Sequence, residues 1–305
     1  MCDSLSRREF MESAALSAAA ISAPVAMSSA SMQTTSAAPR AIKKSLKFPM
    51  VRTEGTILEK FKLLRAIGFH GVELDSPSNL DRDEVLRAKD ETRLAIPGVI
   101  DSKHWSKPLS HPDPNVRAEG RRALEIALHD AKAYGATTVL LVPAVVNKEV
   151  SYDDAYERSQ IEIRKVLPLA EELGVKIAIE NVWNNFLLSP LEAARYIDDF
   201  DHPMLGWYFD VGNIVNYGWP EHWIHVLGKR ILKLDIKEFS RKKRNDEGLW
   251  KGFGVKLLEG DCDWPAVMKA LDEIGYSGWA SAEVPGGGEE RLREIAERMD
   301  RILVS

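Results

Sequence analysis

The stretch from Lys176 to Asn184, KIAIENVWN, holds the pattern that decides the fold. Its apolar half is typical of a buried β-strand, and it ends on Glu180 and Asn181, where a strand opens into a loop. Three later runs repeat this pattern, each with one acid near its carboxyl end: LGWYFDVGN at 205–213 with Asp210, ILKLDIKE at 231–238 with Asp235, and WASAEVPGG at 279–287 with Glu283. We therefore expect four strands that bring four carboxylates to one place.

Strand-like apolar runs alternate with amphipathic helical runs from Leu46 onward. This alternation predicts eight strand–helix units, which make a (β/α)8 TIM barrel, a single α/β domain spanning 41–305. A doubly wound open sheet is the alternative, but it normally carries a Gly-rich nucleotide-binding turn after its first strand, and neither GxGxxG nor GxxxxGK[ST] occurs. We expect the first strand at 46–50, the second at 71–74, and a long basic loop at 241–260.

Composition narrows the class of partner. The chain has 305 residues, 45% of them hydrophobic, and a formal net charge of −5. Nucleic acids and anionic membranes are not expected partners, because phosphate binding normally needs a basic face. The two cysteines are Cys2, in the targeting segment described next, and Cys262, so we expect neither an internal disulfide nor a cysteine-based zinc site. Both a monomer and a homo-oligomer stay open.

The first forty residues are predicted to be a signal peptide and linker rather than part of the domain. The sequence SRREFM at 6–11 precedes a run of small, weakly apolar residues from 14 to 30, a pattern typical of a Tat-type export signal. That run is too weakly apolar for a membrane anchor, so we expect no stable membrane insertion after cleavage. The expected location is the periplasm, or another destination reached by Tat export.

Four carboxylates at strand ends create a repulsion that a cation relieves. The carboxyl ends of barrel strands form the active face, so the four acids named above are expected to converge there. Like charges raise one another's pKa, and a divalent cation removes the conflict. A set of oxygen ligands favours a hard ion, Mg²⁺ or Mn²⁺, over zinc. The alternative is that each acid caps a helix or forms a salt bridge.

From about Leu46 to the C-terminus, the chain resembles the sugar phosphate isomerase/epimerase family with the xylose isomerase-like TIM barrel. The matching pieces are GVEL at 71–74, IEN at 179–181, FDVGN at 209–213, LDIKEF at 234–239 and LLEGDCDWPAVMKALDEIGYSGWASAEV at 257–284. The resemblance implies a cation held by four side chains, which here are Glu180, Asp210, Asp235 and Glu283.

Two positions depart from that family's pattern. Asp235 stands where the family usually has His, which makes the site more anionic and favours Mg²⁺, Mn²⁺ or Ca²⁺. Neutralisation of Asp235 by Lys237 is the alternative to its binding a cation. Asn213 stands where substrate-binding members often carry His, and an amide can hydrogen-bond a hydroxyl but does not titrate usefully.

The reaction that the resemblance implies is proton transfer next to the carbonyl of a sugar, through an enediolate. Glu180 and Glu283 are the expected proton-transfer carboxylates, Lys237 is expected to stabilise the oxyanion, and His104 is expected to be a further acid or base. Substrate contacts are expected from five side chains: Glu73, Trp105, Asn181, Trp183 and Asn213.

Three other functions stand beside the isomerase or epimerase. A lyase or hydratase acting on 3-keto-sugars or glycosides needs the same cation and the same proton abstraction. A non-catalytic sugar-binding barrel needs neither reaction. A metal-dependent phosphodiesterase is disfavoured, because such relatives use a His-rich cluster and none of the seven His falls at the four acid-bearing strand ends. The basic run at 241–244 is expected to be a solvated loop rather than a phosphate site.

Overall fold

The structure, a computed structural model, describes residues 40–305. The predicted Tat-type signal lies outside the described residues. One sheet holds eight strands, each pair of neighbours parallel, in the order β1-β8-β7-β6-β5-β4-β3-β2. The strands are β1 (Ile42–Leu46), β2 (Leu74–Ser76), β3 (Gly98–Asp101), β4 (Thr138–Leu141), β5 (Lys176–Glu180), β6 (Leu205–Asp210), β7 (Ile231–Ile236) and β8 (Gly278–Ala282).

Backbone hydrogen bonds join the two outer strands of this sheet. Lys47 and Glu73, one residue beyond β1 and one before β2, form a parallel bridge. The N–H of Glu73 donates to the carbonyl of Leu46 at 2.9 Å, and the N–H of Phe48 donates to the carbonyl of Glu73 at 2.9 Å. These bonds curl the sheet into the predicted single-domain (β/α)8 barrel, in which the carboxyl ends of all strands face one side.

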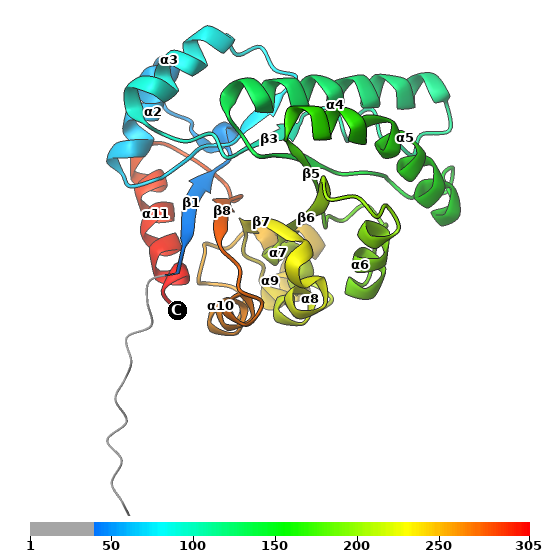
Figure 1. Cartoon of the computed structure of the whole chain (residues 1–305). Coiled ribbons are helices and arrows are strands. Elements are labelled where there is room, and N and C mark those ends of the chain that lie inside the picture. Colours follow the sequence, from blue (N-terminus) through cyan, green and yellow to red (C-terminus); the bar gives the residue numbers. More distant parts are fainter. Residues whose placement is uncertain (1–39) are drawn as a thin grey trace, which may run out of the picture. The chain divides into compact units, whose positions relative to one another are not determined.

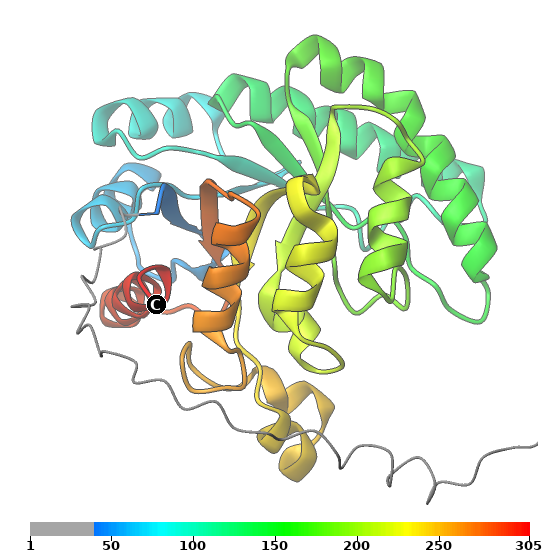
Figure 2. The same ribbon diagram turned by 60° about the horizontal axis from the view of Figure 1, so that its bottom comes forward.

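Helices follow the strands and lie outside them, as Figures 1 and 2 show. The helices are α2 (Ile57–Ala66), α3 (Arg82–Thr92), α4 (Pro114–Tyr134), α5 (Tyr152–Leu173), α6 (Pro190–Asp198), α7 (Val211–Val215), α8 (Pro220–Leu227), α9 (Arg241–Glu247), α10 (Trp264–Glu273) and α11 (Glu289–Leu303). Side-chain caps start most of them, for example Thr56, which forms a capping box with Glu59 at the start of α2. Gly135 adopts the left-handed conformation (φ 74°) and ends α4.

Three predicted segments were placed wrongly. The first strand is Ile42–Leu46 instead of 46–50, because the lysines that made IKKSL look polar have partners elsewhere: Lys44 donates to Asp300 at 2.6 Å. The second strand starts at Leu74 rather than at residue 71. The expected loop at 241–260 contains α9 and a 3₁₀ helix, η3 (Leu249–Phe253). In each case contacts distant in sequence decide the local structure.

The apolar core lies between the sheet and the helices, whereas the barrel interior is partly ionic. Buried apolar side chains from strands and helices form one large cluster, and Leu140, Ala178 and Tyr208 form a small separate one. Glu73 and Lys233 are also fully buried and pair at 2.7 Å. Within residues 40–305, no helix has the length and apolar character needed to span a membrane.

Candidate active site

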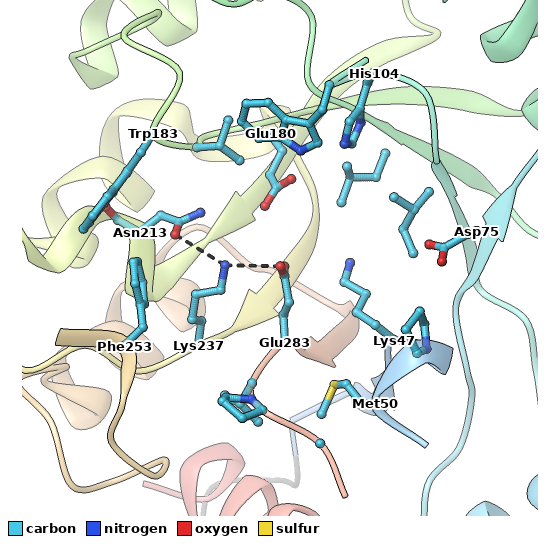
Figure 3. Close-up of a pocket in the computed structure, with 18 of the residues that line it drawn as sticks. Lys47, Met50, Asp75, His104, Glu180, Trp183, Asn213, Lys237, Phe253 and Glu283 are labelled. Atoms are coloured by element: carbon cyan, nitrogen blue, oxygen red, sulfur yellow. Dashed lines mark hydrogen bonds and ion pairs between the residues drawn. The ribbon is translucent and has the colours of Figure 1, made fainter. Parts of the chain in front are cut away.

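The carboxyl ends of the strands open into a cavity of about 560 Å³ (Figure 3). Seven predicted site residues line it: His104, Trp105, Glu180, Trp183, Asn213, Lys237 and Glu283. Asp210 and Asp235 are fully buried beside this group, and Glu73 and Asn181 are buried outside the lining. The sequence interpretation missed several other lining residues, among them Lys47 and Asp75.

The four predicted acids come together at this edge of the barrel. One carboxylate oxygen from each of Glu180, Asp210, Asp235 and Glu283 lies within 4.8 Å of the others. Glu180 is the last residue of β5, Asp210 is the last residue of β6, and Asp235 lies on β7. Glu283 directly follows β8, and its N–H donates to the carbonyl of Ile236 at 3.1 Å. Parallel strand order therefore explains the convergence of acids that are far apart in sequence.

Two lysines flank the acid cluster. The ammonium of Lys237 lies 2.8 Å from Asp210 Oδ2 and 3.2 Å from Glu283 Oε1. The ammonium of Lys47 lies 3.0 Å from Asp235 Oδ1. Four carboxylates and two ammonium groups leave a balance of two negative charges when all are ionised. In Figure 3 the carboxylates of Glu180 and Glu283 face each other, with the two lysine ends on either side.

Burial and charge set the protonation of these acids when no cation is bound. Burial and the charge of Glu283 raise the pKa of Glu180 well above its usual range, and burial raises the pKa of Asp235 in the same way. Burial raises the pKa of Asp210 to about 6, against the opposing effect of Lys237. Burial would also raise the pKa of Glu283, but Lys237 and Lys47 outweigh it and lower that pKa to about 2.

The acid cluster fits a divalent cation. Oxygens on opposite sides of a cation at 2.1–2.6 Å are about 4–5 Å apart, which matches the spacing of the four carboxylate oxygens. Both oxygens of Asp235 and Oδ2 of Asp210 are buried and accept no hydrogen bond of regular geometry from the described residues, although each carboxylate has a lysine nearby. Such oxygens suit a cation, and the two residual negative charges match a divalent one.

Lys47 is oriented by hydrogen bonds to an ionic group in the barrel interior, which contains Glu73 and Lys233. Its ammonium donates to Glu73 Oε2 at 3.0 Å and to the Tyr208 hydroxyl at 3.2 Å. Glu73 in turn accepts from Lys233 at 2.7 Å and from Tyr208 at 2.7 Å. Glu73, predicted as a substrate contact, therefore orients Lys47 instead of lining the cavity. The signal for Lys47 was its place directly after a strand, which only the correct end of β1 reveals.

Two predicted residues take part through hydrogen bonds to the backbone. Asn181 accepts from the N–H of Asp210 at 2.9 Å and donates to its carbonyl at 2.7 Å, which ties β5 to β6 and leaves little of its amide for a ligand. Asn213 donates to the carbonyl of Asn181 at 2.9 Å, and its Oδ1 lies 3.4 Å from the Lys237 ammonium. Asn213 thus lines the cavity, while Asn181 fixes the strand ends beneath it.

His104 faces the cavity as a neutral ring. Its Nδ1 accepts from the N–H of Val142 at 3.2 Å, so the ring proton of the neutral form is on Nε2. Burial lowers the pKa of His104 to about 4, a shift that Glu283 opposes and Lys47 adds to. At neutral pH the ring is therefore a hydrogen-bond donor through Nε2, a more limited role than the predicted acid or base.

The fold and the site together define a barrel with a carboxylate cluster at its active face. The chain belongs to the xylose isomerase-like TIM barrel family, which it matches over residues 61–302. It is 26% identical over 256 residues to L-ribulose-5-phosphate 3-epimerase UlaE of Escherichia coli O1:K1 / APEC, a match that covers 80% of this chain and 87% of the relative.

Solved structures show the same fold. A D-tagatose 3-epimerase-like protein superposes with a TM-score of 0.73 and 18% identity, over 86% of this chain and 97% of that protein. The 3-keto-D-glucoside 4-epimerase YcjR from E. coli superposes with a TM-score of 0.72 and 17% identity, over 87% of this chain and 100% of that protein. These superpositions confirm the predicted barrel, and the match over residues 61–302 confirms the xylose isomerase-like TIM barrel family.

Proposed function

We propose that the protein is a divalent-cation-dependent sugar isomerase or epimerase that moves a proton next to a carbonyl group. The observation that carries this proposal is the pair of Glu180 and Glu283, which extend from different strands and face each other in one cavity. Two carboxylates so placed can serve the two faces of a bound sugar carbon. The similarity to an L-ribulose-5-phosphate 3-epimerase supports the same reaction class.

In the proposed reaction, one of these carboxylates takes the proton from the carbon beside the carbonyl. The C–H electron pair forms a C=C bond and the carbonyl π electrons move to oxygen, which gives an enediolate. Lys237 stabilises the developing oxyanion, and the Nε2–H of His104 is a further donor. The second carboxylate returns a proton to the other face of the same carbon, which gives the epimer. Return of the proton to the neighbouring carbon, with transfer of the hydroxyl proton between the two enediolate oxygens, gives the isomer.

A divalent cation would be held by Glu180, Asp210, Asp235 and Glu283, and it would supply Lewis-acid polarisation of the substrate carbonyl. Mg²⁺ or Mn²⁺ is the proposed ion, because all four ligands are hard oxygens. Lys237 and Lys47 also favour the ionised form of the ligand carboxylates, against the effect of burial.

Solvent exchange tests this proposal. The Mn²⁺-loaded protein is incubated in D₂O with a panel of ketoses and 3-keto-sugars, and deuterium in the recovered sugar is followed by NMR. We expect deuterium at the carbon beside the carbonyl with the wild type, none with Glu283→Gln, and full exchange with the control Glu149→Gln, which changes an exposed acid. A new C=C product instead of an exchanged sugar identifies a lyase. Sugar binding without exchange identifies a non-catalytic barrel and refutes the proposal.

We further propose that the protein is exported by the Tat route and that the mature domain begins near residue 41. The support is the twin arginine in SRREFM at 6–11. Cell fractionation of wild type and of the variant Arg7→Lys/Arg8→Lys tests it. Equal amounts of the two proteins in the exported fraction would refute Tat export.

A further inference from the structure

The outer part of the cavity is lined by aromatic side chains. Trp183 stands against Phe253 and Trp250, with ring centroids 4.8 and 5.0 Å apart, and all three rings line the cavity. Trp250 is 68% exposed, which is unusual for so large an apolar side chain. The lining also includes Trp105, which is 51% exposed. We call Trp183, Trp250 and Phe253 the aromatic platform.

The aromatic platform leads outward from the proposed reacting groups. The Lys237 ammonium lies 5.5 Å from the Phe253 ring centroid, so one end of the platform adjoins the acid cluster. In Figure 3 Trp183 and Phe253 lie on one side of Lys237 and Glu283, while Lys47 and Asp75 lie on the other. A sugar ring at Lys237 and Glu283 would therefore have the platform as its neighbour on one side only.

Two of the three platform rings, Trp250 and Phe253, belong to the segment 241–253, whose basic start at 241–244 was expected to be a solvated loop. Arg241 donates to the carbonyls of Val215 and Gly218 at 2.8 and 2.9 Å, and Arg244 donates to the carbonyl of Asn216 at 3.1 Å. This segment projects beyond the neighbouring helices, coloured gold in Figure 2. The basic residues thus fasten the segment that carries Trp250 and Phe253, and a preorganised aromatic surface binds with little loss of side-chain entropy.

Few charges in the cavity are available for an anion. Lys47 and Lys237 are each paired with carboxylates, which leaves Arg52 as the lining cation without an ion pair among the described residues. The glycine-rich turn before α11 offers little to a phosphate, because the first turn of that helix carries Glu289 and Glu290. The outer cavity therefore suits an uncharged group with flat apolar faces and a hydroxylated edge, which describes a pyranose ring.

We propose that the aromatic platform is a subsite for a second, uncharged sugar ring, so that the substrate is a glycoside or disaccharide rather than a sugar phosphate. This inference rests on the proposed function, since it places the reacting keto ring at Glu180, Glu283 and Lys237. The neighbouring ring stacks its C–H face on Trp250 and Trp183. The cavity of about 560 Å³ has room beyond a single monosaccharide.

Calorimetric titration of the full-length Mn²⁺-loaded protein tests the subsite with four probes: 3-keto-glucose, 3-keto-cellobiose, 3-keto-trehalose and fructose 6-phosphate. We expect at least one keto-disaccharide to bind roughly tenfold or more tightly than 3-keto-glucose. Trp250→Ala removes that advantage, Trp250→Phe keeps most of it because a flat face remains, and Leu191→Ala, an exposed apolar residue outside the cavity, leaves it intact.

The outcomes separate the subsite from the proposed reaction. Deuterium exchange into 3-keto-glucose without any preference for disaccharides overturns the subsite and leaves the reaction standing. A preference for disaccharides that Trp250→Ala abolishes, with no exchange into any probe, keeps the subsite and refutes the reaction. Tightest binding of fructose 6-phosphate, or an unchanged preference in Trp250→Ala, also overturns the subsite.

Discussion

The ionic group inside the barrel makes a quantitative prediction about stability. Glu73 and Lys233 are each 1% exposed and pair at 2.7 Å. Lys47 links this pair to Asp235, so the four side chains carry two positive and two negative charges. Glu73→Gln or Lys233→Met alone leaves one uncompensated buried charge, which costs about 3–5 kcal/mol of unfolding free energy. The double variant restores the balance, because Lys47 and Asp235 still neutralise each other.

We therefore expect the two substitutions to be strongly non-additive. The loss in the double variant should be smaller than the sum of the two single losses by about 2–3 kcal/mol. Urea unfolding of the full-length protein, followed by far-ultraviolet circular dichroism, measures all four corners of the cycle. The matched control is the exposed pair Lys242–Asp246, where no coupling is expected because solvent screens the charges. Additivity of the buried pair within about 0.5 kcal/mol would refute the charge-balance reasoning.

Three further predictions follow from the site and its rim. Mn²⁺ at a hundred times its Kd should stabilise the metal-free protein by about 2.7 kcal/mol, a rise in Tm of roughly 5–10 °C that Asp235→Asn reduces, measured by calorimetry. His104, with its pKa lowered to about 4, should cost about 2 kcal/mol of stability between pH 7 and pH 5, because the unfolded chain takes up the proton first; His104→Asn should remove that loss in urea titrations at both pH values. Gly252→Ala should cost about 1–3 kcal/mol in the same assay, since its Cβ would lie 2.3 Å from the Phe239 ring, whereas Gly288→Ala, with open space around it, should not.

Each of these has a clear contrary result. An unchanged Tm with Mn²⁺ would remove the cation from the site. A pH dependence identical in His104→Asn and wild type would mean that the ring is not held neutral by burial. Equal stability of Gly252→Ala and wild type would mean that the segment 241–253 is not packed tightly against Phe239, which would also weaken the case for a rigid platform.

The acid-bearing strands were predictable because their signal is local. The strands β5 to β8 appear in the sequence as apolar runs that are too short for helices, and each run leads into a turn. Parallel strands in a barrel share one active face, so an acid at each strand end predicts a cluster without knowledge of any contact. The structure brings these four acids within reach of one cation, as that reasoning expects.

The structure of the segment 241–253 was not predictable, because it depends on contacts with residues distant in sequence. Its letters, RKKRNDEGLWKGF, are polar at the start and show no apolar face. The helix forms because Ser240 caps it and because Arg241 and Arg244 bind carbonyl groups around Val215 and Gly218. A basic run looks the same in sequence whether its partners are phosphates, water or backbone carbonyls 23 to 28 residues away, so its role depends on contacts that only the fold provides.

The role of Asp235, at the centre of the site, also depends on a contact distant in sequence. In sequence the residue offered two explanations, a cation ligand or a partner of Lys237. In the structure its ammonium neighbour is Lys47 at 3.0 Å, while Lys237 pairs with Asp210 and Glu283. Because Lys47 is itself fixed by Glu73 and Tyr208, the charge of Asp235 is balanced by a lysine that the ionic group in the barrel interior holds in place. The neutralising lysine is therefore Lys47 rather than Lys237. Lys47 lies next to Oδ1 of Asp235, which leaves Oδ2 to face a cation, so this neutralisation is compatible with cation binding by Asp235.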